Sequence, residues 1–209
     1  MPSHRASPGR EQSAVAQTAA GLVGSPRGAD AVPAGRVVQH QGHPCSGPFV
    51  VVRGALLETS VDDEGRVMGL DVLGAGDAGG GPCGLLSPAS IRAVAPSRIR
   101  PVPPAEAEPL EHRRHERMVA LARDLAWLDV TERIAGRLDD LAQRFGRPQA
   151  EGTLIRLAIT QEDLAALCGT SRESANRALG ALSARGRIRV LGRGRYLVPA
   201  PLRVLDHRH

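Results

Sequence analysis

The sequence contains no lysine and few aromatic residues. All 27 basic residues are arginine, and aromatic side chains make up only 2% of the 209 residues. Proteins that bind RNA or single-stranded DNA stack bases on aromatic side chains, so this scarcity argues against both classes. Without lysine the chain cannot form the Gly-Lys-Ser phosphate loop of nucleotide hydrolases, and neither an HExxH sequence nor a Ser/His/Asp order occurs. We therefore assign no catalytic residue.

Cysteines are few, and long apolar runs are absent. Cys45, Cys83 and Cys168 are widely spaced and odd in number, which predicts neither a disulfide framework nor a zinc or iron–sulfur site. No apolar run approaches the roughly 20 residues that span a bilayer, and residues 1–5 lack the apolar region of a signal peptide. These absences indicate a cytosolic protein with reduced thiols and no membrane partner.

The positive charge is confined to one part of the chain. Residues 154–209 contain ten arginines against four acidic residues, a net charge of +6, whereas residues 1–110 carry −1 and residues 111–153 are neutral. A compact basic unit is typical of proteins that bind polyanions, because arginine displaces counterions from phosphates. A solvated basic tail is the alternative that composition alone leaves open.

The first half of the chain predicts β-structure after an unstructured segment. Residues 1–31 are rich in Ser, Ala, Gly, Pro and Gln without apolar periodicity, and we expect them to be disordered. Residues 32–104 contain short β-branched runs cut by glycine and proline, which is typical of a small β-barrel or roll. Strands are expected within 50–59, where a glycine separates them, and at 67–73. The glycine-rich residues 74–84 are expected to be too flexible for a strand.

Residues 105–147 predict a long helix followed by a shorter one. Residues 110–128 contain neither glycine nor proline, and their apolar side chains recur at spacings of three and four, the narrow seam of a helix that pairs with another helix. We expect this seam to form a homodimer, the alternative being a stripe that packs on the chain's own β-domain. A second helix is expected at 131–145, started by a capping box of Asp129 and Glu132. The residues of the expected dimer seam are Met118, Leu121, Leu125 and Leu128.

Residues 148–209 predict a helix-turn-helix followed by a β-hairpin. A short helix begins after Thr160 and is broken by Gly169; a second begins at Arg172 and ends at Gly186, where a left-handed cap is expected. Two short helices joined by a glycine-containing turn define this motif. Two short strands then form the hairpin, called the wing, at residues 187–190 and 195–198.

The second of these helices carries charged and polar residues on its exposed face. In a winged helix the first turns of this helix enter the major groove of DNA. Arginine presents a bidentate fork to guanine and glutamate accepts from the amino group of cytosine, so Arg172, Glu173 and Arg177 are expected to read a half-site that contains G·C pairs. Asn176 lies on the same face and is also expected to read a base. The alternative is an ordinary solvated face with an ion pair between residues four apart. The residues expected to hold DNA phosphates are Thr160, Gln161, Ser171, Ser174, Arg193 and Arg195.

Three segments in the second half of the chain form an ordered set of motifs. They read LDVTxRIA at 128–135, ITQEDLA at 159–165 and GxSRESxxR at 169–177, and together they closely resemble the cyclic AMP receptor and fumarate-nitrate regulator (Crp/Fnr) superfamily of bacterial transcription factors. The resemblance implies an α+β fold with an N-terminal cyclic-nucleotide-binding-like β-roll, a long dimerisation helix and a C-terminal winged helix-turn-helix. It also implies a homodimer on palindromic double-stranded DNA with TGTGA-like half-sites. An activator of this kind also contacts RNA polymerase.

The part of the β-region that binds a cyclic nucleotide in this family departs from the family's pattern. In the family a Gly-Glu holds the ribose and an Arg-Ser or Arg-Thr holds the phosphate, whereas this sequence has Pro82 in place of Glu and Ser87-Pro88 in place of Arg-Ser. A cyclic phosphate without its arginine loses a charge-assisted bidentate pair. We therefore expect a regulator without cyclic AMP or another cofactor, with Arg92 on the following strand as a candidate substitute.

Two histidine patterns suggest a different kind of sensor. His40-x-x-His43-x-Cys45 has the spacing of metal or haem ligands, and His112-x-x-His115 lies on one helix face. Such short patterns often occur by chance, and solvated histidines are the commoner explanation, so we assign no metal ligand. A metal- or haem-sensing regulator and a winged-helix module that binds another protein remain as alternatives.

Overall fold

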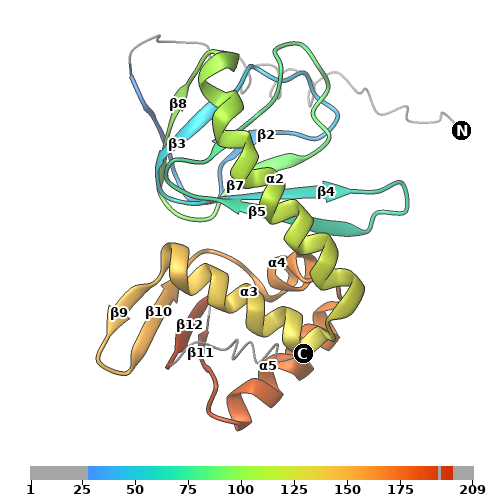
Figure 1. Ribbon diagram of the computed structural model, residues 1–209, viewed down its shortest axis with the longest axis vertical. Helices are drawn as coiled ribbons and strands as arrows, with labels where there is room; N and C mark the ends of the chain where they lie inside the picture. The colour runs from blue at the N-terminus through green and yellow to red at the C-terminus, as the bar shows by residue number, and fades with distance from the viewer. Residues whose placement is uncertain (1–27, 193, 200–209) are drawn as a thin grey trace, which may run out of the picture.

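The computed structural model describes residues 28–192 and 194–199. Figure 1 shows a β-roll above a C-terminal domain, with a long helix running from one to the other. The α+β class expected from the sequence is confirmed. Most of the segment expected to be disordered lies outside the described residues. Among those described, no helix is long and apolar enough to cross a membrane.

Eight short strands form the β-roll as two antiparallel sheets. One sheet has the order β1-β8-β3-β6 and the other β2-β7-β4-β5. Alternate side chains of a strand point to the same face, and Val51, Leu56, Leu73 and Ile91 are almost fully buried in the core of the roll. The strands are β1 (Asp30–Val32), β2 (Val37–Gln39), β3 (Phe49–Arg53), β4 (Leu56–Val61), β5 (Val67–Leu73), β6 (Ala78–Gly79), β7 (Ser90–Ala93) and β8 (Ser97–Pro101).

Two strands of the roll lie where the sequence predicts none. β1 begins at Asp30, within the segment expected to be disordered, and it is ordered by pairing with β8. β6 lies inside the glycine run and pairs with β3. A Cβ atom at Gly79 would lie 2.8 Å from the side chains of Leu73 and Phe49. Glycine at this position therefore provides close packing rather than flexibility.

The long helix α2 (Pro104–Trp127) begins before the expected start at residue 110. Pro104 occupies the first helical position, where the missing N–H has no intrahelical partner to lose. The second helix, α3 (Val130–Phe145), begins with the predicted capping box, which is confirmed. Asp129 and Glu132 exchange two hydrogen bonds of 2.9 Å between side chain and backbone.

The C-terminal domain packs helices on a four-stranded antiparallel sheet with the order β11-β12-β10-β9. The helix-turn-helix and the wing lie close to the predicted positions, and Gly186 has the positive φ of 66° expected of a helix cap. The sequence does not predict β9 and β10, since Pro148 is unusual in a strand; it is tolerated because β9 is an edge strand. The elements are β9 (Arg147–Gln149), β10 (Gly152–Arg156), α4 (Gln161–Leu167), α5 (Arg172–Ala184), β11 (Arg189–Gly192) and β12 (Arg195–Val198).

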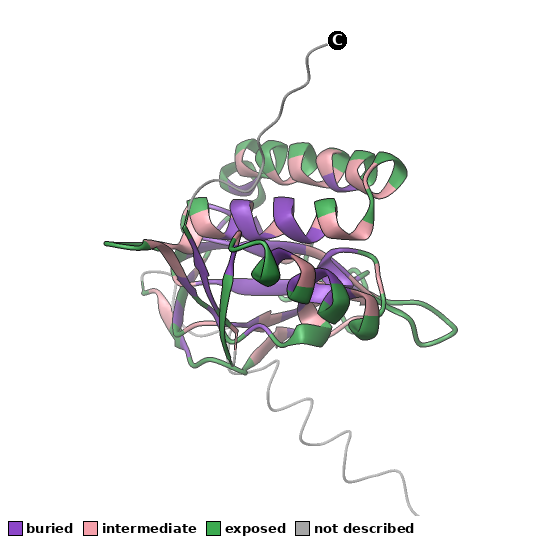
Figure 2. Ribbon diagram, turned by 90° about the horizontal axis from the view of Figure 1, so that it is seen from below, coloured by how far each residue is buried: buried purple, intermediate pink, exposed green. Residues whose placement is uncertain are grey.

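The β-roll and the C-terminal domain pack directly on each other. One hydrophobic core joins Leu57 and Val72 of the roll to Ile134 of α3 and to α4. Figure 2, a view from below, shows buried segments at the centre of the molecule. A Cβ atom at Gly69 of β5 would lie 2.7 Å from the backbone nitrogen of Leu167. This close approach sets the position of α4, and with it the helix-turn-helix, against the roll.

Buried ion pairs tie α2 and α3 to the roll. Three arginines of the two helices contact three nearly buried carboxylates, at distances from 2.5 to 3.5 Å. Burial raises the pKa of Glu58, although the Arg114 guanidinium acts in the opposite direction. The arginines of this cluster, which we call the junction arginines, are Arg114, Arg117 and Arg144, and their partners are Glu58, Asp71 and Asp77.

Candidate DNA interface

The start of α4 is held by a second capping box. The Thr160 hydroxyl accepts from the Asp163 N–H at 3.0 Å, and the Asp163 carboxylate accepts from the Thr160 N–H at 2.8 Å. Arg92 of β7 donates to the same carboxylate at 2.8 Å. Thr160 and Gln161 are exposed, so two of the residues expected to hold phosphates lie at the solvent-facing start of α4.

The turn between α4 and α5 fixes the first residue of α5. Gly169 has a φ of 55°, and a Cβ atom there would lie 2.4 Å from the Leu125 side chain of α2, so glycine is favoured at this turn. The Ser171 hydroxyl accepts from the Ser174 N–H at 3.2 Å and caps α5. Arg172 is therefore the first residue of a helix with a satisfied N-terminus.

Helix α5 has one buried and one exposed face. Ala175, Ala178, Leu179 and Leu182 are buried in the domain core, and their spacing follows the 3.6-residue helical period. The residues expected to read bases therefore lie together on the opposite, solvent-exposed face. They are Arg172, Glu173, Asn176 and Arg177.

Two of these residues contact each other. Arg177 forms an ion pair with Glu173 and donates to the Ser174 hydroxyl at 2.8 Å, as the alternative of a solvated face also requires. An exposed pair four residues apart contributes only about 0.3–0.5 kcal/mol, whereas a bidentate contact between arginine and guanine contributes about 1–3 kcal/mol. Guanine can therefore replace Glu173 as the partner of the Arg177 guanidinium. The Arg172 side chain has no ion pair or hydrogen bond within the described part of the chain.

The wing closes tightly against β10. Gly194 has a φ of 69°, and a Cβ atom there would lie 2.1 Å from the carbonyl oxygen of Leu157, so glycine is required at this turn. Arg195 is exposed and donates to the carbonyl oxygen of Leu191 at 3.1 Å. Arg193, the other wing residue expected to contact phosphate, lies outside the described residues.

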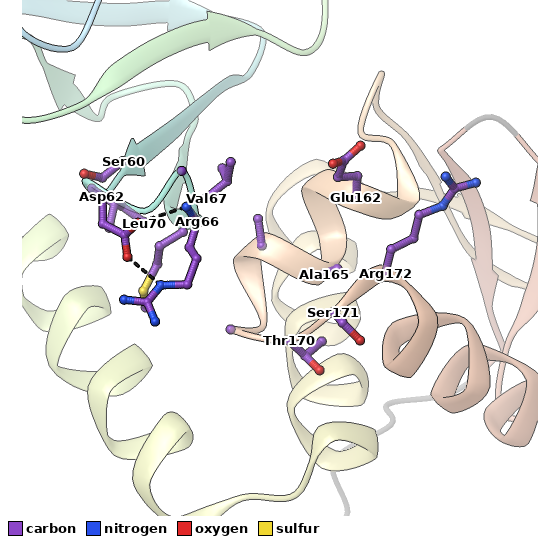
Figure 3. Close-up of a pocket in the computed structure, with 14 residues that line it drawn as sticks. Ser60, Asp62, Arg66, Val67, Leu70, Glu162, Ala165, Thr170, Ser171 and Arg172 are labelled. Atoms are coloured by element: carbon purple, nitrogen blue, oxygen red, sulfur yellow. Dashed lines mark hydrogen bonds and ion pairs between the residues drawn. The ribbon is translucent and has the colours of Figure 1, made fainter.

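A cleft of about 870 Å³ separates the helix-turn-helix from the β4–β5 hairpin. Figure 3 shows Arg66 of the hairpin paired with Asp62, facing α4 across the cleft. Arg172 lines one edge of the cleft, but its guanidinium extends away from the hairpin (Figure 3). The side chain expected to read guanine is therefore directed toward solvent and not toward the roll.

The four residues of the seam expected to form a dimer are buried or half-buried. Leu121 is only 5% exposed, and Leu125 packs against Gly169 of the same chain. Met118 and Leu128 are half-buried. Leu121 and Leu125 thus pack on the chain's own C-terminal domain. The sequence left open that this stripe packs within its own chain, although on the β-domain.

A neighbouring stripe of α2 faces outward. Val119 is 54% exposed and Trp127 is 76% exposed, although both are large and apolar. Beside them lie further exposed residues at spacings of three and four, the spacing of a helix-pairing seam. Sequence reasoning missed this stripe because four of its five members are histidine or alanine. The residues of this outward stripe are His112, His115, Val119, Ala122 and Ala126.

The region that corresponds to the family's phosphate cassette contains turns and no helix within residues 80–89. Ser87 is buried, and its hydroxyl donates to the carbonyl oxygen of Ala89 at 2.7 Å. Arg92, the candidate substitute for the missing phosphate ligand, is paired with Asp163 of α4 instead. Its guanidinium therefore serves the contact between the roll and the C-terminal domain.

The two histidine patterns are not joined by further ligands. The rings of His40 and His43 lie 5.6 Å apart, and His112 contacts Glu116 at 3.4 Å. Within the described residues, no group of three or more His, Cys, Asp or Glu side chains is arranged to hold a metal ion. Burial raises the pKa of the Cys168 thiol to about 12, which makes Cys168 a poor ligand and nucleophile.

Comparison with known proteins matches the C-terminal part of the chain most closely. A Crp-like helix-turn-helix domain matches residues 132–203. The CRP-like cAMP-activated global transcriptional regulator of Mycobacterium tuberculosis is 43% identical over 70 residues, which cover 34% of this chain and 31% of the regulator. The chain therefore matches less than a third of that relative's length, and the helix-turn-helix family model covers the candidate DNA interface.

Longer and weaker similarities extend over both domains. The cAMP-activated global transcriptional regulator CRP of Haemophilus influenzae is 27% identical over 187 residues, covering 77% of this chain and 80% of that protein. The structure of a CRP/FNR-family regulator from Thermus thermophilus superposes with a TM-score of 0.70 at 21% identity, covering 82% of this chain and 93% of that one. FixK2 from Bradyrhizobium japonicum gives a TM-score of 0.69 at 18% identity, covering 83% and 93%. The two structures establish the shared fold.

Proposed function

Because the chain belongs to the Crp/Fnr superfamily of transcription regulators and carries its helix-turn-helix DNA-binding domain, we propose that it acts as a homodimer on palindromic DNA with TGTGA-like half-sites. In each half-site Arg172 and Arg177 contact guanines and Glu173 accepts from cytosine. The protein works as a regulator and not as an enzyme. Its site of action is the cytoplasm, at the nucleoid, and as an activator it also contacts RNA polymerase.

The single observation that carries this proposal is the exposed N-terminal part of α5. Arg172 is the first residue of a capped helix, has no partner in the described structure, and points toward solvent. An unpaired arginine at this place retains all of its donors for a base edge. Asn176, one turn further along the same face, is positioned to contact an adjacent base.

Phosphate contacts hold the protein in register on the duplex. The exposed starts of α4 and α5 present backbone N–H groups and hydroxyls, a favourable setting for an anion. The wing adds positive charge on the other side of α5. The residues that we assign to phosphates are Thr160, Gln161, Ser171, Ser174, Arg193 and Arg195.

We propose that the homodimer forms through the outward stripe of α2, with Met118 and Leu128 at its border. Ala122 and Ala126 allow two helix backbones to approach closely, and exposed Val119 and Trp127 lose unfavourable contact with water. A parallel pair of α2 helices places the two α5 helices on the same side of the dimer. That arrangement matches a palindromic site.

The lack of a phosphate-binding arginine supports regulation without cyclic AMP. Arg92 is paired with Asp163, and the junction arginines are already occupied by carboxylates. Breaking a partly buried ion pair to bind one phosphate leaves a buried carboxylate unpaired, which is strongly unfavourable. We therefore expect cyclic AMP to leave the affinity for DNA unchanged.

A mobility-shift titration with a TGTGA-type palindrome and a scrambled duplex tests the proposal. The wild-type protein is expected to prefer the palindrome, and Arg172→Ala to lose about 1–3 kcal/mol of that preference, or about five- to 150-fold. The matched control is Arg36→Ala, because Arg36 is also exposed and lacks a partner but lies on the roll. Equal preference in the wild type and Arg172→Ala would overturn the base-reading assignment.

The same titration separates the alternative classes. A winged-helix module that binds another protein predicts no preference between the two duplexes and little dependence on salt, whereas DNA binding weakens steeply with salt through counterion release. A metal or haem sensor predicts that an added ligand changes the affinity. The described histidines lack a third ligating group, so we do not favour this class.

A further inference from the structure

A second cleft lies between the two domains, at the opposite end of β4 from the hairpin. It has a volume of about 780 Å³. The roll contributes the β3–β4 and β7–β8 turns to its walls, and the C-terminal domain contributes the end of α3, β9 and β10. A cleft of this size is typical of a small-molecule site.

Four arginines line this cleft, and none of its lining residues is acidic. Arg53 and Arg98 come from the roll, and Arg147 and Arg156 from the C-terminal domain. Within the described structure the side chains of Arg53, Arg147 and Arg156 have no ion pair or hydrogen bond, and the Arg98 side chain donates only to a backbone carbonyl at 3.2 Å. The junction arginines, by contrast, all contact carboxylates. The cleft therefore concentrates uncompensated positive charge from segments that are far apart in the sequence.

The floor of the cleft is rigid and largely apolar. Gly54 has a φ of 99°, and a Cβ atom there would lie 2.6 Å from the Cα atom of Ser97. The Ser97 hydroxyl accepts from the Ala55 N–H at 3.1 Å and donates to the Ala95 carbonyl at 2.8 Å. Buried Leu157 and the Phe145 ring complete the lining. The two roll turns are thus locked together before any ligand binds.

We propose that this cleft binds a nucleoside polyphosphate. Guanidinium groups match phosphate oxygens in bidentate geometry, and four of them complement a ligand with several negative charges better than a cyclic mononucleotide with one. The apolar floor and the Phe145 ring suit a nucleobase. Duplex DNA is a convex partner, whereas these arginines surround a concave cleft with an apolar floor, so we favour the small ligand.

A ligand in this cleft links the two domains. Its phosphates contact Arg53 or Arg98 on one wall and Arg147 or Arg156 on the other, so binding stabilises the packed arrangement in which the Ala158 N–H donates to the Val94 carbonyl at 2.6 Å. The affinity for the ligand and the orientation of the helix-turn-helix are then coupled. This regulatory consequence rests on the proposed DNA-binding function, whereas the binding site itself does not.

Calorimetric titration of the full chain tests the site, with ATP, tripolyphosphate and cyclic AMP as probes. ATP and tripolyphosphate are expected to bind once per protomer, ATP more tightly, and cyclic AMP at least tenfold more weakly. Arg53→Ala and Arg156→Ala are each expected to weaken ATP binding about tenfold, while the control Arg36→Ala leaves it unchanged. The replaced side chains are exposed and have no partners, so the fold is retained.

Two results would overturn the site. One is an equal loss of ATP affinity in Arg36→Ala, which would indicate attraction by net charge. The other is an absence of ATP binding together with weaker binding of long DNA by Arg53→Ala and Arg156→Ala, which would assign the cleft to flanking DNA. Arg172→Ala distinguishes this inference from the proposed function, because it is expected to reduce the preference for the palindrome and to leave ATP binding unchanged.

Discussion

The junction arginines and the arginines of α5 are the same residue type in opposite surroundings. Arg114, Arg117 and Arg144 are largely covered, and each contacts a carboxylate that is almost inaccessible to water. Arg172 and Arg177 are exposed, and Arg172 has no partner in the described structure. Burial removes a charge from water and requires a partner of opposite sign, whereas an exposed arginine remains free for an external anion. In this chain, burial separates the arginines that pair with carboxylates of the fold from the arginines that remain accessible to an external anion.

The largest effect is expected where a junction arginine loses its partner. Asp71→Asn removes the charge that Arg117 and Arg144 contact and should lower the free energy of unfolding by about 3–5 kcal/mol, measured by urea denaturation. Glu64→Gln is the matched control, because Glu64 pairs with Arg66 at the surface, and it should cost less than about 1 kcal/mol. Equal effects of the two substitutions would show that burial does not distinguish the two kinds of pair.

A smaller effect is expected from placing a charge on the outward stripe of α2. Ala122→Glu should weaken self-association at least tenfold, or by about 1.4 kcal/mol, because it introduces two like charges where the helices of a dimer meet. Sedimentation velocity measures the change. Ala34→Glu, at an exposed turn of the roll, is the control and should leave the oligomeric state unchanged. A dimer that is equally stable in Ala122→Glu would show that the dimer interface lies on another surface.

The smallest effect concerns the pH dependence of stability at the junction. Burial raises the pKa of Glu58 from its usual value of 4.5, so its contribution to stability is fully present below the unfolded-state pKa. That contribution is lost as the pH rises through the folded-state pKa. Glu58→Gln removes the titration, and the unfolding free energy of the wild type minus that of the variant should fall between pH 4 and pH 7. A difference that rises with pH would mean that Arg114 outweighs burial.

The candidate DNA interface could be predicted from the sequence because its signals are local. Thr160, Ser171 and Gly186 mark helix ends through hydrogen bonds and backbone angles within a few residues. The orientation of α2 could not be predicted in this way, since Leu121 and Ala122 belong to adjacent stripes and only tertiary packing decides which one is covered. The junction arginines also gave no signal, because their partners lie about fifty residues or more away in the sequence.

The cleft lined by four arginines is the site that is hardest to predict from the sequence. Its arginines come from β3, β8, β9 and β10, and no local motif connects them. β6 illustrates the same point in the roll, where a glycine run that suggests flexibility forms a strand because Gly79 must pack against two large side chains. Local sequence patterns predict where helices end and which of their faces are apolar. A site assembled from separate turns cannot be predicted from such patterns, because the fold alone brings its residues together.

The most direct test of the central claim is a double-mutant cycle between Arg172 and the base pairs of the half-site. Each G·C pair of a TGTGA-like half-site is replaced by A·T in turn, and the affinities of the wild type and Arg172→Ala are measured at one salt concentration. At the pair that Arg172 reads, the wild type should lose about 1–3 kcal/mol while Arg172→Ala loses almost nothing. The same loss in both proteins at every position would contradict base reading by the exposed arginine of α5.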